Sequence, residues 1–142
     1  MMLLEDKLIV GLYIRGADLD PDLVTKRLGI VPSRSQQKGE TRATPTNRDY
    51  VTKVGLWGLI SDLDSVLVNE HIAYLTSKLG ATASGIRGIP GVNEAYFDVF
   101  VATKADVDGE GSSEFELSHD TLAVLSKIGL PVRFTVAVVR EN

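Results

Sequence analysis

Residues 8–32, LIVGLYIRGADLDPDLVTKRLGIVP, decide the fold class of this chain. Residues 8–14 alternate between two faces that are both largely apolar, which predicts a central β-strand. Asp20-Pro21-Asp22 then offers an N-cap, a proline at the first helical position and an acid that complements the helix dipole. Gly29 is a C-terminal stop and Pro32 prevents continuation, so a short helix follows the strand.

The rest of the chain continues this alternation of strands and helices. Apolar or alternating stretches predict further strands at residues 51–60, 83–86, 96–103 and 132–139. A second helix is expected after a cap at Asp62 or Ser65, with a buried stripe of Val68, Ile72, Leu75 and Leu79. A third is expected after a cap at Ser118, with Leu122 and Leu125 facing inward. The last strand places Val132, Phe134, Val136 and Val138 on one face.

These elements predict an α+β fold in a single domain spanning residues 1–142. Three helices would pack on one antiparallel or mixed sheet of four to six strands. The segment 19–30 has an echo at 117–131, where a cap, a helix and a glycine follow one another in the same order. That echo is compatible with β-α-β units of the ferredoxin-like kind, and equally with shared capping residues alone.

Composition excludes several classes of protein. The 142 residues are 44% hydrophobic and 24% charged, which is ordinary for a soluble globular domain and unlike a disordered or fibrous chain. The absence of cysteine excludes disulfides, cysteine-ligated metals and thiol nucleophiles. Neither a signal peptide nor a membrane-spanning run is evident, so we expect a cytoplasmic protein.

Charge is distributed unevenly along the chain. The net charge is −4, yet residues 26–53 hold seven basic residues and two acids, and residues 106–120 hold six acids and no lysine or arginine. The molecule is therefore expected to carry a basic face and an acidic face, an arrangement that is compatible with homo-oligomers. The overall acidity disfavours nucleic acid as a partner.

The strongest functional indication is a long polar loop predicted at residues 33–49. It carries four basic side chains, Arg34, Lys38, Arg42 and Arg48. Arginine gives bidentate contacts to phosphate or carboxylate, so the loop is a candidate anion-binding or partner-binding site. The alternative is a mobile, solvated loop, and for stacking on bases it offers only Tyr50 at its edge.

Two further residues are candidates for the same role. Trp57 stands between Gly55 and Gly58, where small neighbours permit close approach of a ligand, although a core tryptophan on a central strand explains the pattern equally well. Arg87 lies in a glycine-rich turn and would extend an anion site if the turn folded near the basic loop.

The order of the motifs resembles a known family. LDPD at 19–22, LGIVPS at 28–33, KGE at 38–40 and GLW at 55–57 are its most specific elements, and the match covers nearly the whole chain. This pattern resembles a family of small bacterial proteins classed only as a domain of unknown function. The resemblance implies a bacterial, single-domain, cytoplasmic protein, and it brings no activity and no site residues.

Catalytic and metal-binding candidates are few. His71 and His119 lack a second histidine at helical spacing, and a surface or half-buried position is expected for both. Asp106, Asp108 and Glu110 occupy EF-hand-like positions, but Leu117 stands where a bidentate glutamate is required. Asp98 and Asp62 are carboxylates without an evident partner. We expect no catalytic residue, metal or cofactor.

The sequence therefore favours a non-catalytic binding or protein-interaction module that uses the basic loop, with an unidentified protein or a small anionic ligand as its partner. A small-molecule sensor for anions or nucleotides is the alternative. A toxin-neutralising immunity protein fits the size and the acidity, although no motif supports that role.

Overall fold

The computed structural model describes residues 7–43, 49–106, 108 and 111–140. Its strands are β1 (Lys7–Gly16), β2 (Arg34–Gln36), β3 (Thr41–Ala43), β4 (Asp49–Val51), β5 (Gly55–Ile60), β6 (Glu94–Lys104) and β7 (Val132–Val139). Its helices are α1 (Pro21–Leu28), α2 (Val68–Leu79), α3 (His119–Ile128) and the 3₁₀-helix η1 (Gly80–Gly88).

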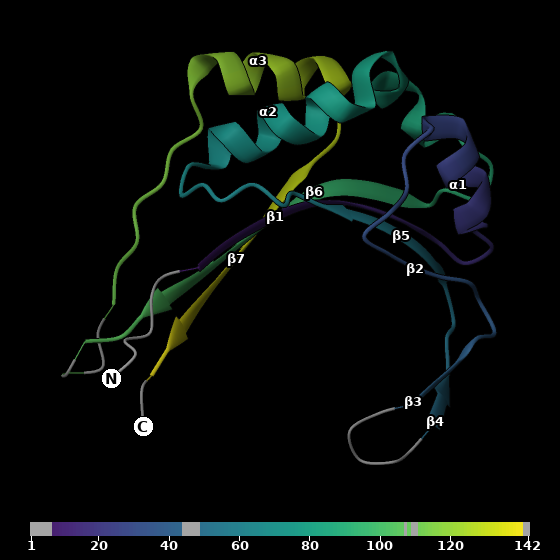
Figure 1. The fold of residues 1–142 in the computed structure, drawn as a ribbon, viewed down its shortest axis with the longest axis horizontal. Helices are drawn as coiled ribbons and strands as arrows, with labels where there is room; N and C mark the ends of the chain where they lie inside the picture. The colour runs from purple at the N-terminus through teal and green to yellow at the C-terminus, as the bar shows by residue number, and fades with distance from the viewer. Residues whose placement is uncertain (1–6, 44–48, 107, 109–110, 141–142) are drawn as a thin grey trace.

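One curved sheet organises the molecule. Five strands lie in the order β2-β5-β1-β6-β7, and β3 pairs with β4 in a separate two-stranded arm. The three α-helices lie on the outer side of the arched sheet, and the arm extends from one end of it (Figure 1). The predicted α+β fold with three helices on one mixed sheet is confirmed, and β1 is the central strand.

The described elements form three β-α-β connections, and two of them interlock. β1 pairs antiparallel with both β5 and β6, and β2 pairs antiparallel with β5. The unit β1-α1-β2 therefore encloses β5, and the unit β5-α2-β6 encloses β1. The last unit, β6-α3-β7, adds a parallel strand directly beside β6. None of the helices in the described part of the chain has the length and apolar character needed to cross a bilayer.

The ends of α1 and α3 follow the capping residues in the sequence. The Asp20 carboxylate accepts from the Asp22 N–H at 3.0 Å, and Gly29 has a φ of 69°, as a left-handed C-terminal stop requires. The Ser118 hydroxyl accepts from the Thr121 N–H at 3.2 Å, and Gly129 ends α3 with a φ of 77°. Local capping is therefore sufficient to set both helices.

The predicted start of α2 and the predicted strand at 83–86 are wrong. α2 begins after Leu67 without a side-chain cap, and the Ser65 hydroxyl instead accepts from the Leu67 N–H at 3.1 Å. Ala83, Ile86 and Ile89 are all buried, and a spacing of three matches the 3₁₀ period of η1 rather than the two-residue period of a strand.

Two smaller expectations also need correction. Leu122 is exposed rather than inward, because α3 buries only Thr121 and Leu125, which lie one turn apart on a single side. The predicted strand at 51–60 is split, since β4 ends at Val51 and β5 begins at Gly55.

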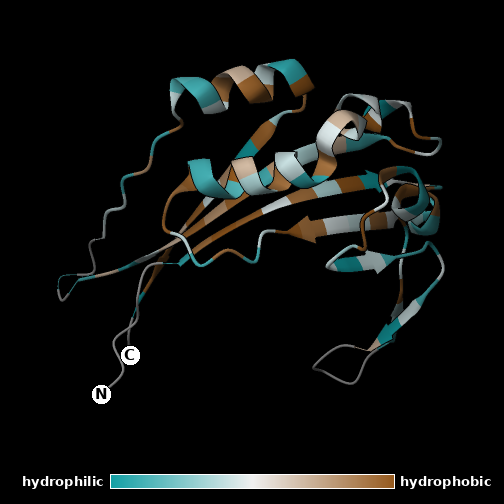
Figure 2. Ribbon diagram, turned by 45° about the horizontal axis from the view of Figure 1, so that its top comes forward, coloured by the Kyte–Doolittle hydropathy of each residue, from teal (hydrophilic) through white to brown (hydrophobic). Residues whose placement is uncertain are grey.

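The hydrophobic core fills the space between the helices and one face of the sheet. Val10, Leu12 and Ile14 of β1 are completely buried there, together with Trp57 of β5 and Phe97 of β6. In Figure 2 the sheet strands carry long hydrophobic stretches, whereas the β3–β4 arm is largely hydrophilic. The arm therefore projects from the domain without contributing to its core.

Two glycines, Gly16 and Gly55, allow neighbouring backbone segments to approach each other closely. A side chain at Gly55 would collide with the carbonyl oxygen of Leu19, and one at Gly16 would collide with that of Gly91. Both obstacles are backbone atoms, which cannot rotate away as a flexible side chain can. The connection from β1 into α1 is thus held against the start of β5 by the absence of a Cβ.

We expect Gly55→Ala to lower the free energy of unfolding by about 1–3 kcal/mol, because overpacking displaces backbone. Gly85→Ala is the matched control, since no atom lies within 4 Å of its added methyl group. Urea denaturation of both variants measures the difference. Equal stability of the two would show that the contact between Gly55 and Leu19 is not tight.

Candidate functional site

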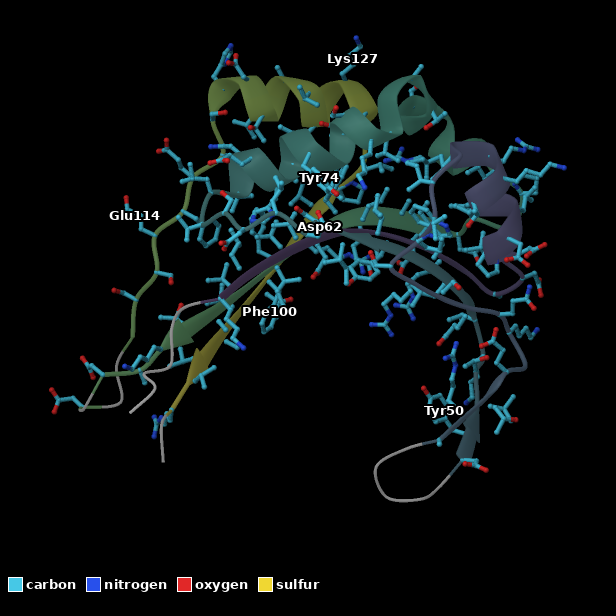
Figure 3. All side chains as sticks on the ribbon, in the orientation of Figure 1. Tyr50, Asp62, Tyr74, Phe100, Glu114 and Lys127 are labelled. Carbon is cyan, nitrogen blue, oxygen red and sulfur yellow. The ribbon has the colours of Figure 1, made fainter. Side chains whose placement is uncertain are left out.

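The face of the sheet that points away from the helices carries a mixture of aromatic and charged side chains. No described element covers it in Figure 1, and Phe100 projects from it in Figure 3. The residues of β1, β5 and β6 that alternate with the core residues all point to this side. We call it the open face.

One register line crosses four strands of the open face. Arg34 of β2 lies opposite Gly58 of β5, Gly58 lies opposite Tyr13 of β1, and Tyr13 lies opposite Tyr96 of β6. The two tyrosine rings stack with centroids 5.9 Å apart and planes inclined by 30°. We call Arg34, Gly58, Tyr13 and Tyr96 the cross-sheet row.

Glycines allow the ring of Tyr13 to lie over the strands. A Cβ at Gly58 would come within 2.9 Å of Tyr13 Cε1 and 3.1 Å of Arg34 Cγ, and one at Gly11 would come within 3.2 Å of Tyr13 Cε2. The ring therefore occupies the space that two side chains would otherwise fill. As a result Arg34 and Tyr13 lie side by side at the centre of the open face.

An ion-pair cluster continues the row at the opposite edge of the sheet. The Arg133 guanidinium lies over the Tyr96 ring, with Cζ 3.8 Å from the centroid, and its Nη2 is 3.0 Å from Glu94 Oε2. Arg15 Nη1 is 3.6 Å from the other oxygen of Glu94. Tyr96 is thus enclosed between Tyr13 and Arg133, which explains why a tyrosine on an uncovered face is buried.

Two titratable groups of the open face have shifted pKa values. Burial raises the pKa of Asp98 above its ordinary 3.8, and the charge of Arg133 offsets this only in part. Burial likewise raises the pKa of Tyr13, while the positive charge of Arg34 acts in the opposite direction.

The predicted basic loop at 33–49 is not one open loop. It contains β2 and β3, and the buried Thr52 ties its turn down. The Thr52 hydroxyl donates to the Gln37 carbonyl at 2.5 Å and accepts from the Glu40 N–H at 3.0 Å. The described residues 33–43 therefore have a defined shape beside the sheet.

The structure separates the basic residues of this segment. Lys38 Nζ lies 3.5 Å from Asp18, and Arg42 Nη2 lies 2.6 Å from Glu40 and 3.0 Å from the Ser35 carbonyl. Among the described residues, none forms an ion pair with Arg34, which points to the open face. Arg48 lies outside the described residues.

Trp57 and Arg87 do not join Arg34. Trp57 has no exposed surface, and its indole N–H donates to the Thr25 hydroxyl at 3.0 Å, so it is a core residue. Arg87 donates to the Gly129 carbonyl at the end of α3 and lines a cavity of about 370 Å³ with Glu94 and Arg133. Two strands, β5 and β1, lie between this cavity and β2.

The remaining catalytic candidates do not form an accessible site. His71 is buried, contrary to expectation, with Nδ1 2.7 Å from the Ser61 hydroxyl and Nε2 2.8 Å from the Ser65 carbonyl. This pairing fastens the connection between β5 and α2. His119 is exposed in the first turn of α3, and Asp62 is exposed on that connection.

Within the described ranges no three histidine, aspartate or glutamate side chains gather as metal ligands would. Of the acidic residues considered for calcium, Asp106 accepts from the Asp108 N–H at 2.9 Å in a local turn, and Glu110 lies outside the described residues. The described part of that loop is a solvated turn.

Comparison with known proteins places the chain in a family. A family model described as "Domain of unknown function (DUF4279)" matches residues 6–139. The chain belongs to this family. No curated protein and no solved structure matches it. The matched range includes all the described strands and helices, and hence the whole open face.

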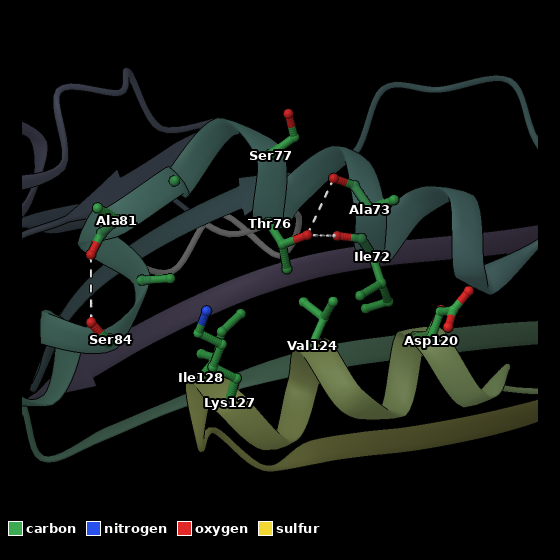
Figure 4. Close-up of a pocket in the computed structure, with 13 residues that line it drawn as sticks. Ile72, Ala73, Thr76, Ser77, Ala81, Ser84, Asp120, Val124, Lys127 and Ile128 are labelled. Atoms are coloured by element: carbon green, nitrogen blue, oxygen red, sulfur yellow. Dashed lines mark hydrogen bonds between the residues drawn. The ribbon is translucent and has the colours of Figure 1, made fainter.

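A second concave region lies on the helix side, between α2, η1 and α3. It measures about 560 Å³, and Val124 and Ile128 of α3 face Ala73 and Thr76 of α2 across it (Figure 4). The Thr76 hydroxyl is bonded to carbonyl groups of its own helix, Ile72 at 2.8 Å and Ala73 at 3.2 Å. Besides its apolar surface, the groove is lined by polar and charged residues, namely Ser77, Ser84, Asp120, Thr121 and Lys127.

The sequence carries a signal for the open face in the alternation along its strands, although no motif marks it. Tyr13 alternates with the core residues of β1, Tyr96 and Asp98 alternate with those of β6, and Arg133 alternates with those of β7. A period of two therefore assigns all four to the same kind of face. Their mutual register cannot be read from the sequence, because strand order sets it.

We expect Asp98→Asn to raise the free energy of unfolding at neutral pH. A carboxyl group whose pKa is raised by folding weakens the folded state at every pH above its folded pKa, and the penalty disappears as the pH falls below the ordinary value of 3.8. Urea denaturation across this range should show the advantage of the asparagine variant closing toward low pH. Asp64→Asn, at an exposed position, is the control, and an equal advantage there would contradict the role of burial.

Proposed function

We propose that this protein is a non-catalytic binding module whose recognition surface is the open face of its sheet. The partner presents an anionic group, which Arg34 binds beside the Tyr13 ring. The cross-sheet row is the observation that carries the proposal, because one register line brings a cation and two aromatic rings together on a face that no described helix covers.

The charges of the open face support an anionic partner. Arg15 and Arg133 share the single carboxylate of Glu94, so Glu94 neutralises only one of the two positive charges. Arg34 adds a further positive charge at the other edge of the row. Asp98 lies beside the row as well, where burial raises the pKa of its carboxyl group and Arg133 acts in the opposite direction.

Arg34 is the best-placed binding residue of the basic segment. Lys38 pairs with Asp18, and Arg42 pairs with Glu40. A new anion would have to displace one of these carboxylates to bind either basic residue. Arg34 requires no such exchange. A guanidinium beside an aromatic ring also offers planar hydrogen bonding to phosphate or carboxylate.

The alternative function, a small-molecule sensor, would use the same surface. A sensor binds a free anion such as phosphate or citrate tightly, whereas a protein-interaction module binds the same anions only weakly, as fragments of a larger epitope. We further infer that β2-β5-β1-β6 forms a ferredoxin-like core, on the basis of its two interlocked β-α-β units, and that the protein acts in the bacterial cytoplasm.

Titration of the ¹⁵N-labelled protein with inorganic phosphate and with citrate tests the proposal. We expect shifts in the amide signals of Arg34, Tyr13 and Gly58, and weaker binding at higher salt. Arg34→Ala should reduce affinity by about tenfold or more, because a hydrogen bond to a charged group contributes about 1.5–3 kcal/mol.

Arg27→Ala removes an exposed arginine from α1, on the helix side, and should leave the titration unchanged. Lys38→Ala should also have little effect, since Asp18 already neutralises this lysine. Shifts that are absent from the cross-sheet row, or that survive Arg34→Ala, would contradict the proposed surface. Dissociation constants in the micromolar range for a free anion would favour the sensor.

A further inference from the structure

The edge strand β7 has an unpaired side along its length. It is eight residues long, and within the described structure it pairs only with β6. The Pro131 carbonyl accepts from the Phe97 N–H of β6, and the Val139 carbonyl accepts from the Ala105 N–H just after β6. Because backbone groups alternate in direction along a strand, Phe134, Val136 and Val138 direct their N–H and C=O groups to the open edge.

The same three residues expose apolar side chains. Phe134 is 45% exposed, Val136 58% and Val138 52%. Their partners on β6 are Val99, Val101 and Thr103, so they lie on the helix side of the sheet, beyond the cover of α3. Phe115 stacks on Phe134 with centroids 5.6 Å apart and is itself 37% exposed.

This edge lacks the features with which proteins protect an edge strand. Short length, lysine, proline and bulges are the usual devices. β7 contains none of them, and its one charged side chain, Arg133, lies over Tyr96 and pairs with Glu94. The opposite edge, β2, has only three residues and is therefore protected by its length.

We propose that β7 pairs antiparallel with β7 of a second copy of this chain. A register centred on Val136 places Val136 opposite its own copy and Phe134 opposite Val138 of that copy. The two-fold axis repeats the pair of Phe134 and Val138, so there are three pairs. All of their residues direct backbone N–H and C=O groups outward, and each pair therefore forms two hydrogen bonds. The exposed apolar side chains then contact one another across the two-fold axis.

Charge and symmetry favour this occupant over an unrelated strand. In this register Thr135 lies opposite Ala137 on the open face, and Arg133 lies opposite Val139, so no like charges meet. The contact is isologous and closes on itself. Because β2 offers too short an edge for a second such contact, a closed dimer results, with two five-stranded sheets joined into one of ten strands.

Light scattering coupled to size-exclusion chromatography tests the dimer on the full chain. We expect about twice the 15.4 kDa mass of one chain at micromolar concentration. Val136→Lys should yield a monomer, because it sets two charges opposite each other on the axis. Val66→Lys makes the same change at a residue that is 86% exposed on the β5–α2 connection, and it should leave the dimer intact.

A single engineered cysteine tests the register, since the chain has no cysteine of its own. Paired residues in this register have Cα atoms about 5.5 Å apart, within the disulfide range of about 4.4–6.8 Å. Val136→Cys should therefore oxidise to a covalent dimer, and Val66→Cys should not. A monomeric wild-type chain, or a dimer that persists in Val136→Lys, would overturn the proposal.

Discussion

The structure depends on β1, a central strand that is hydrogen-bonded on both edges and buried on one face only. Val10, Leu12 and Ile14 face the helices, and the strands that flank them bury Trp57 on β5 and Phe97 on β6. The residues of β1 that alternate with these three lie on the open face, which no described helix covers. Gly11 and Tyr13 fit together there, because the ring lies over the space that the glycine leaves.

The open face follows from this constraint. With all three helices on one side, the second side is stabilised by stacking and ion pairs: Tyr13 on Tyr96, Tyr96 under Arg133, and Arg133 against Glu94. These contacts hold the side chains in place before any partner arrives. A preorganised surface loses less conformational entropy on binding than a mobile surface does, which supports the proposed recognition through the open face.

Features that depend on residues close together in the chain could be predicted from the sequence, and features that depend on strand order could not. Asp20 and Gly29 set α1, and Ser118 and Gly129 set α3, because a cap acts within one helical turn. A strand at 83–86 is wrong because Ala83, Ile86 and Ile89 are buried at a spacing of three, and a run of four residues is too short to reveal that period in the sequence. Trp57 and Arg34 were both candidates for binding, and only the strand order distinguishes the buried residue from the one on the open face. The ion pairs of Lys38 and Arg42 likewise depend on tertiary positions.

The parallel pairing of β7 has a consequence for folding during synthesis. The antiparallel strands β2, β5, β1 and β6 are complete once the ribosome has released residue 104, and α1 and α2 already cover them. β7 can join only after α3 has crossed over the sheet, and α3 buries just two of its own residues. The C-terminal unit is therefore the last to join, and its Leu125 and Leu130 then complete the hydrophobic core.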